Sequence, residues 1–121
     1  MAKTALELTP EQWKQYEPWR NFKPAVERWE RAWKVAREAA RILRNEFGAT
    51  RVVVFGSLRS KNLYTQWSDV DLAVSGIPRS RYLEAMGRLL DLSPEFKIDL
   101  IDLDSCDERF LECIESQGIE V

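Results

Sequence analysis

Three aspartates stand in two apolar segments of the chain, Asp69 and Asp71 in one and Asp99 in the other. Side chains alternate between the faces of a β-strand, so Asp69 and Asp71 are predicted to share one face, about 7 Å apart. Two carboxylates at that distance repel each other, and a divalent cation between them relieves the repulsion. Ligands that are all oxygen favour Mg²⁺ or Mn²⁺. The spacing therefore indicates a site for a hard metal ion.

Asp99 lies in the middle of the segment Phe96–Leu103, FKIDLIDL, which is otherwise mostly apolar. A carboxylate in such a strand costs on the order of several kcal/mol unless a partner compensates it. We therefore expect Asp99 to join Asp69 and Asp71 in one site, and Asp102, on the opposite face, to be structural. The alternative is that Asp69 and Asp71 are solvated residues of an edge strand, because short motifs also occur by chance.

A glycine and a serine end the strand that precedes these acids. Residues 52–55 are an apolar, β-favouring run that is too short for a helix and stops at Gly56. Gly56 allows a sharp turn and the close approach of another group, and Ser57 is expected to cap a short helix with its hydroxyl. Backbone N–H groups and a hydroxyl directed at one point suit a phosphate.

Taken together, these segments resemble the minimal nucleotidyltransferase (MNT) family of the DNA polymerase β-like superfamily. The resemblance covers about residues 25–121 and rests on a strand ending in Gly-Ser, an Asp-x-Asp strand and a later Ile-Asp-Leu-Ile strand, with the motif residues Gly56, Ser57, Asp69, Asp71 and Asp99. It implies an α/β nucleotidyltransferase fold, with a small mixed sheet of three to four strands flanked by helices. The loop after Ser57 departs from the family pattern, so either Arg59 or Lys61 is the cation expected to contact the phosphates.

Members of that family commonly act as antitoxins paired with HEPN-domain toxins. The resemblance therefore implies that Asp69, Asp71 and Asp99 hold two Mg²⁺ ions and catalyse transfer of AMP from ATP. The acceptor would be a tyrosine hydroxyl of a HEPN ribonuclease toxin, which the modification inactivates. Two alternatives remain: an inactive antitoxin that neutralises its toxin by binding alone, and nucleotidyl transfer to a hydroxyl of RNA or a small molecule.

Composition restricts the chemistry further. The 121 residues, 45% of them hydrophobic, fit one domain, and the absence of histidine excludes histidine bases and histidine-bound zinc. Residues 1–48 carry ten Lys/Arg and seven Asp/Glu (+3), and residues 49–121 carry eight and thirteen (−5), which together give the formal charge of −2. This balance does not favour DNA binding. With no membrane-length apolar run and no signal-peptide pattern, we expect a cytoplasmic protein with no membrane contact, and Cys106 and Cys113 as reduced thiols.

The chain is expected to divide into an aromatic helical extension, residues 1–23, and the nucleotidyltransferase domain, residues 24–121. The extension would begin a helix at Thr9 and carries aromatic side chains every three residues, at Trp13, Tyr16, Trp19 and Phe22. These aromatic residues either pack on the next helix or form an exposed patch for a protein partner.

Within the domain, the apolar spacing predicts a long amphipathic helix from Pro24 to Phe47 that ends at Gly48. A second face of this helix carries Lys34, Arg37, Arg41 and Arg44. These cations are either solvated or form a basic ridge that meets nucleotide phosphates or an acidic partner.

The remaining segments predict two strands that are antiparallel or offset, because the connection between Ser57 and Asp69 is too short for a parallel crossover. Tyr64 and Trp67 in that connection either pack the loop or stack on a base. Later helices are predicted over residues 80–92 and from a capping box at Ser105 to Gly118.

Overall fold

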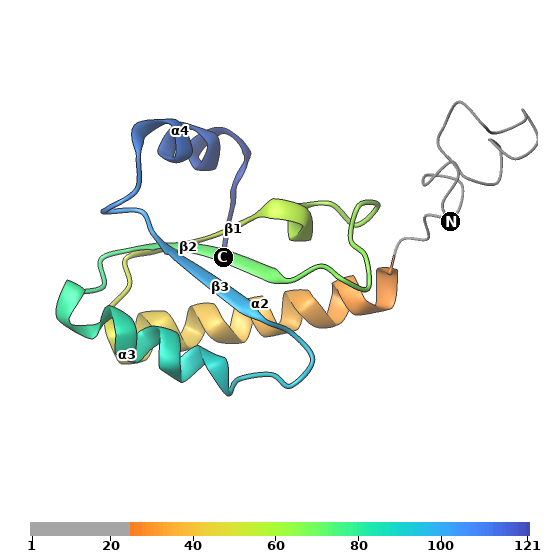
Figure 1. Ribbon diagram of the computed structural model, residues 1–121, viewed down its shortest axis with the longest axis horizontal. Coiled ribbons are helices and arrows are strands. Elements are labelled where there is room, and N and C mark those ends of the chain that lie inside the picture. The colour runs from red at the N-terminus through yellow and green to blue at the C-terminus, as the bar shows by residue number, and fades with distance from the viewer. Residues whose placement is uncertain (1–24) are drawn as a thin grey trace, which may run out of the picture.

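The computed structural model describes residues 25–121, so the predicted N-terminal extension lies outside the described residues (Figure 1). A mixed α/β arrangement is present, as predicted. Its elements follow in the order α2 (Val26–Phe47), β1 (Arg51–Phe55), η3 (Gly56–Arg59), β2 (Val70–Ser75), α3 (Arg79–Leu90), β3 (Ile98–Asp102), α4 (Glu108–Gln117) and β4 (Ile119–Glu120).

Four strands form one mixed sheet in the order β3-β2-β1-β4. The two strands joined by the short connection, β1 and β2, are antiparallel, which confirms the prediction from its length. The β2–β3 pair is parallel and is crossed by α3. This parallel pairing aligns Asp71 with Asp99 in register, although the two residues are 28 positions apart along the chain.

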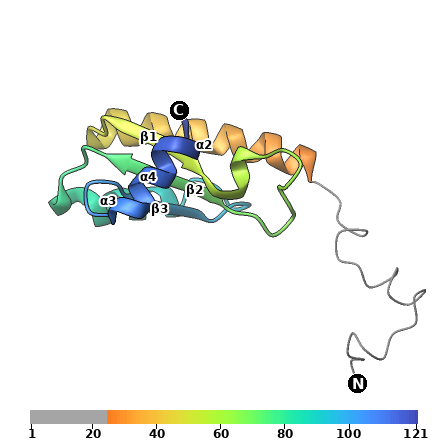
Figure 2. The same cartoon turned by 90° about the horizontal axis from the view of Figure 1, so that it is seen from above.

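The two faces of the sheet are covered differently (Figures 1 and 2). The larger core lies on one face, where residues of α2 and α3 pack against alternate strand residues that include Val52, Val54, Leu72, Val74 and Leu100. The smaller core lies on the other face and contains Val53, Ala73, Leu103 and Ile114, the last from α4. Strand alternation places Asp71 and Asp99 on this second face, outside the large core.

Helix α2 buries a ridge of small and branched residues against the sheet, namely Ala32, Ala36, Ala39, Ala40, Ile42, Leu43 and Phe47. Alanines let the helix approach the strands closely and favour helix formation. The helix ends as predicted at Gly48, which has a φ of 75° and donates its N–H to the carbonyl of Leu43. This left-handed conformation suits glycine because it lacks a Cβ.

Several predicted element boundaries were wrong. The N-cap of α4 is Asp107, whose side chain accepts a hydrogen bond from the N–H of Phe110, and Ser105 instead donates to Asp102. Ser57 lies inside η3 and makes no capping hydrogen bond, because Phe55 holds the cap position. Helix α3 ends at Leu90, and the short strand β4 was not predicted.

Among the helices of residues 25–121, none has the length and apolar character needed to cross a membrane.

Candidate active site

Asp71 and Asp99 form the centre of the site. They are partners in the parallel β2–β3 register, and both are only partly exposed. The negative charge of Asp99 acts on the carboxyl group of Asp71. The residue directly before β3 is Lys97, whose Nζ lies 3.6 Å from Oδ1 of Asp99. That ion pair is exposed to solvent, so it offsets little of the repulsion between the two acids.

The pKa of Asp71 is raised to about 6. Burial beside β1 is the largest cause, because it disfavours the charged carboxylate, and the negative charges of Asp99 and then Asp69 add to it. The negative charges of Asp69 and Asp99 therefore both act on Asp71, at the edge of the small core. Such a raised pKa within a cluster of like charges is typical of functional sites.

Asp69 lies in the loop directly before β2. Its charge reaches Asp71, but within the described part of the chain no three acidic, histidine or cysteine side chains are grouped closely enough to form a metal-binding set. The structure therefore brings Asp71 and Asp99 together, with Asp69 as a neighbour and not as a third member in contact.

Gly56 and Asp71 are adjacent across the β1–β2 pair. Gly56 has a φ of 72°, and a Cβ added there would collide with Oδ2 of Asp71. Glycine is thus needed for two reasons, the left-handed backbone and the space for the carboxylate. The Gly-Ser turn and the acids, which the sequence separates by more than ten residues, form one site.

The two cations predicted to contact phosphates are placed differently. Arg59 donates to the carbonyl of Gly56 at 3.0 Å and to Gln117 at the end of α4. Lys61 is exposed, with its Nζ 6.0 Å from the ring centre of Trp29. Arg59 therefore supports the turn from behind, and Lys61 lies towards α2.

Tyr64 positions the loop that leads into β2. It is fully buried, which confirms packing as its role, and its hydroxyl donates to the carbonyls of Ser68 and Asp69. Arg28 of α2 also donates to the Ser68 carbonyl, at 3.0 Å. Sequence reasoning missed Arg28, because nothing in a helical pattern indicates a contact with a loop 40 residues away.

The prediction that Trp67 packs within the loop was wrong, since 82% of this side chain is exposed. Hydrogen bonds between Thr65 and Ser68 close the turn and leave the indole outside it. Asp102, by contrast, has the predicted structural role, because it accepts hydrogen bonds from Asp104 and Ser105 in the turn after β3.

The site residues thus belong to a Gly-Ser turn after one strand and to acids on two neighbouring strands, which is the layout of a nucleotidyltransferase. Residues 37–121 match the family model described as "Polymerase beta, Nucleotidyltransferase". The match spans more than half of the 121 residues, so the chain belongs to this family. No curated protein matches the chain significantly.

Solved structures of similar fold are toxin–antitoxin complexes. One contains a tri-AMPylated HEPN toxin of Shewanella oneidensis with its MNT antitoxin, with 20% identity, a TM-score of 0.55, and coverage of 74% of this chain and 70% of that one. A variant MntA complex has 25% identity, a TM-score of 0.55, and coverage of 70% and 69%. A third, MntA–HepT, has 21% identity, a TM-score of 0.52, and coverage of 72% and 68%.

The donor set around Asp71 fits a divalent cation of the Mg²⁺ type. The ligands available are carboxylate oxygens, and the pair Asp71–Asp99 carries like charges that a cation would neutralise. Among residues 25–121, Asp71 itself forms no ion pair. The nearby Lys97 pairs with Asp99.

Proposed function

We propose that this protein is an antitoxin nucleotidyltransferase that transfers AMP from ATP to a tyrosine hydroxyl of a HEPN toxin and thereby inactivates it. The observation that carries the proposal is the Asp71–Asp99 pair in register beside the Gly56 turn. Membership of the nucleotidyltransferase family supports the reaction type. The similar structures, one of them with an AMPylated HEPN toxin, support the acceptor and a hetero-oligomeric assembly.

Asp71 and Asp99, with Asp69 beside them, are the residues that would hold two Mg²⁺ ions. When bound, the ions supply positive charge that lowers the pKa of the acceptor hydroxyl and neutralises the leaving pyrophosphate. The role of the protein is to hold Asp71 and Asp99 side by side on one face of the sheet, next to the Gly56 turn, with Asp69 in the loop before β2.

Gly56 and Ser57 would grip the β- and γ-phosphates. The backbone of Gly56 can approach a phosphate because it carries no side chain, and the Ser57 hydroxyl is not used to cap η3. Arg59 holds the turn by its bond to the Gly56 carbonyl, which leaves Lys61 as the freer of the two predicted cations.

In the transfer step the acceptor oxygen forms a bond to the α-phosphorus of ATP. The bond between that phosphorus and the oxygen bridging to the β-phosphorus breaks, and pyrophosphate leaves with the electron pair. Asp99 accepts the proton of the acceptor hydroxyl and passes it to solvent. It suits this role because 44% of its side chain is exposed, so a proton on it can exchange with solvent.

The test uses the purified protein and the HEPN protein encoded beside it, incubated with ATP and Mg²⁺ and followed by intact-mass measurement of the HEPN protein. The expected result is a mass increase of one or more AMP units on a tyrosine. The double variant Asp69→Asn/Asp71→Asn is expected to add none, whereas the control Asp91→Asn, exposed at the end of α3, transfers normally.

Transfer by the double variant at the normal rate would overturn the assignment of the acids. If neither the native protein nor the double variant transfers AMP, and both still neutralise the toxin in cells, the binding-only alternative is correct. Modification of RNA in the same mixture, with the HEPN protein unchanged, would move the acceptor from protein to nucleic acid.

A further inference from the structure

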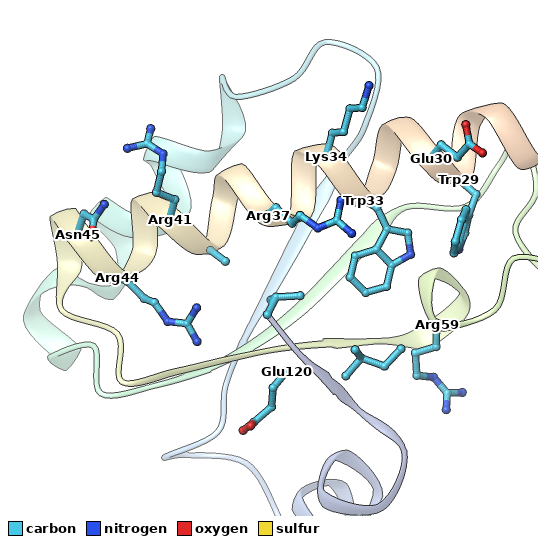
Figure 3. A pocket seen from close by; sticks show the side chains of 13 residues that line it. Trp29, Glu30, Trp33, Lys34, Arg37, Arg41, Arg44, Asn45, Arg59 and Glu120 are labelled. Carbon is cyan, nitrogen blue, oxygen red and sulfur yellow. The ribbon is translucent and has the colours of Figure 1, made fainter.

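A hollow lies away from Asp71 and Asp99, between α2 and the edge strand β4 (Figure 3). Its volume is about 990 Å³, which is enough for several side chains of another molecule. We call it the α2–β4 groove. The residues that line it include Trp33, Lys34, Arg37, Ala40, Arg44 and Ile119.

The α2–β4 groove is separate from the candidate active site. Helix α2 covers the sheet face opposite to the one on which Asp71 and Asp99 lie, as the two cores establish. The sheet order also puts β4 and β3 on opposite edges. The basic face of α2 therefore lies on the other side of the sheet from Asp71, and Arg59, which holds the Gly56 turn, is the residue that the groove and the turn share.

Three cations of the groove lack, among residues 25–121, the acidic partners that other arginines have. Elsewhere in residues 25–121, Arg31, Arg51, Arg81 and Arg88 each pair with a glutamate. Arg37 and Arg44 have no acidic partner among the described residues, and neither has Lys34, while Arg41 pairs with Glu38. Figure 3 shows the guanidinium of Arg44 directed towards β4. A row of unpaired cations along a hollow favours an anionic ligand.

The floor of the groove is apolar and firm. Ala40 is buried, and Ile119 of β4 has 40% of its side chain exposed. The indole N–H groups of Trp29 and Trp33 both donate to the carbonyl of Leu58, at 2.9 and 3.1 Å, which fixes the two rings as a wall. An apolar floor below a cationic rim fits a ligand that has both apolar and acidic groups.

We propose that the α2–β4 groove docks an acidic polypeptide segment with interspersed apolar side chains. The segment belongs to the toxin partner, an assignment that rests on the proposed function. The α2 residues lining the groove run from Trp29 to Asn45, a rise of about 24 Å, which an extended segment of roughly seven residues would span.

A nucleic acid fits the same surface less well. Arg37 lies over the ring of Trp33 at 5.5 Å, so this face of the indole is not free to stack on a base.

The test measures binding of labelled probes to the full-length protein by fluorescence anisotropy, without ATP. The probes are an eight-residue peptide of alternating Glu and Leu, the same peptide with Gln for Glu, and an eight-nucleotide single-stranded RNA. We expect the acidic peptide to bind at least tenfold more tightly than either other probe, with an affinity that decreases as salt increases. Equal binding of the Gln peptide, or tighter binding of the RNA, would overturn the proposal.

The groove is assigned by the double variant Lys34→Glu/Arg44→Glu, which should weaken binding of the acidic peptide at least tenfold. The neutral variant Lys34→Gln/Arg44→Gln should fall between this variant and the native protein. The matched control Arg79→Glu/Arg109→Glu has the same change in charge outside the groove and should bind normally. If the control pair weakens binding as much as the groove pair, the groove is not the site.

This experiment also distinguishes the groove from the proposed reaction. Binding of the peptide requires neither nucleotide nor the acids, so it should persist in Asp69→Asn/Asp71→Asn. If the native protein binds the acidic peptide in the groove but transfers no AMP, the proposed function is wrong and the docking site stands. If it transfers AMP but does not bind the peptide, only the docking site is wrong.

Discussion

At the scale of single residues, Gly56 and Asp71 constrain each other more than any other pair in the site. The positive φ of Gly56 costs an L-amino acid about 1 to 3 kcal/mol, and a side chain there also meets Oδ2 of Asp71. Gly48 has a similar φ of 75° with nothing near its Cβ position, so it separates the two effects.

We therefore expect Gly48→Ala to lower the free energy of unfolding by about 1 kcal/mol and Gly56→Ala to lower it by more than about 2 kcal/mol. The excess should disappear when Asp71→Ala removes the carboxylate, which gives a coupling of about 1 kcal/mol or more in a double-mutant cycle. Urea denaturation of the four proteins measures this. A cost at Gly56 equal to that at Gly48 would mean that the carboxylate moves aside freely.

The raised pKa of Asp71 makes stability depend on pH. Its folded pKa of about 6 exceeds the ordinary value of 3.8, so between these values the folded protein binds a proton that the unfolded chain releases. Stability is consequently highest below about pH 4 for this group and decreases as the pH rises through 6. Partial exposure screens the effect, and we expect about 1 to 2 kcal/mol.

The variant Asp71→Asn should accordingly unfold at a higher temperature than the native protein at pH 7 and at the same temperature at pH 4. Thermal melts in EDTA across this range test it, because the chelator keeps divalent ions from masking the repulsion. If Asp71→Asn raised the melting temperature equally at both pH values, the ionisation of Asp71 would not be the cause of the stabilisation.

At the scale of elements, the helix caps show what local sequence specifies. Both Ser105 and Asp107 lie before α4, and a serine followed three residues later by Glu108 favours the capping box. The turn after β3 decides otherwise, because Ser105 is already bonded to Asp102 there. The sequence pattern could not reveal that competition, since it depends on where β3 ends.

Asp107→Ala should therefore lower the free energy of unfolding by about 1 kcal/mol, the usual value for the loss of an N-cap. Ser105→Ala should cost less than half as much, because its bond is exposed and closes only a turn. Urea denaturation of the two variants measures the difference. Equal losses in the free energy of unfolding would indicate that Ser105 contributes as much as Asp107 to capping α4.

The elements that depended on apolar spacing were predicted well. The helix ending at Gly48, the strand that stops before Gly56 and the strand that contains Asp99 follow from local periodicity. The predicted strand face shared by Asp69 and Asp71 was wrong, because Asp69 lies in the loop before β2, and it is the long-range β2–β3 pairing that brings Asp71 next to Asp99. What the sequence could not predict depends on long-range contacts. The short strand β4 has two residues and is held by pairing with β1, and Trp67 is exposed because a turn closes without it.

At the scale of the whole molecule, the sheet separates the candidate active site from the α2–β4 groove. The acids lie on the face with α4, and the α2–β4 groove lies beyond α2 at the opposite edge. Helix α2, which lines the groove, carries six Lys/Arg and four Glu, whereas residues 49–121 carry a formal charge of −5. Charges separated by more than a Debye length of about 8 Å act weakly on each other at physiological salt.

The variant Lys34→Glu/Arg44→Glu should therefore bind ATP with Mg²⁺ within about twofold of the native affinity at 0.15 M salt. Isothermal titration with the nucleotide measures it, with Lys97→Glu, next to Asp99, as the variant in which a change is expected. A tenfold loss in the groove variant would show that the two surfaces are coupled through the sheet.

The alternation that leaves Asp71 on one face of β2 and buries Leu72 on the other has a consequence for changes in chain length. One residue inserted in β2 before Asp71 would reverse the sides of the strand residues that follow it and turn Asp71 into the large core. One residue inserted at the exposed turn of residues 61–63 would leave that order intact. Tolerance to insertion should thus change abruptly between these neighbouring positions, and a scan of single insertions scored by thermal melting would locate the boundary.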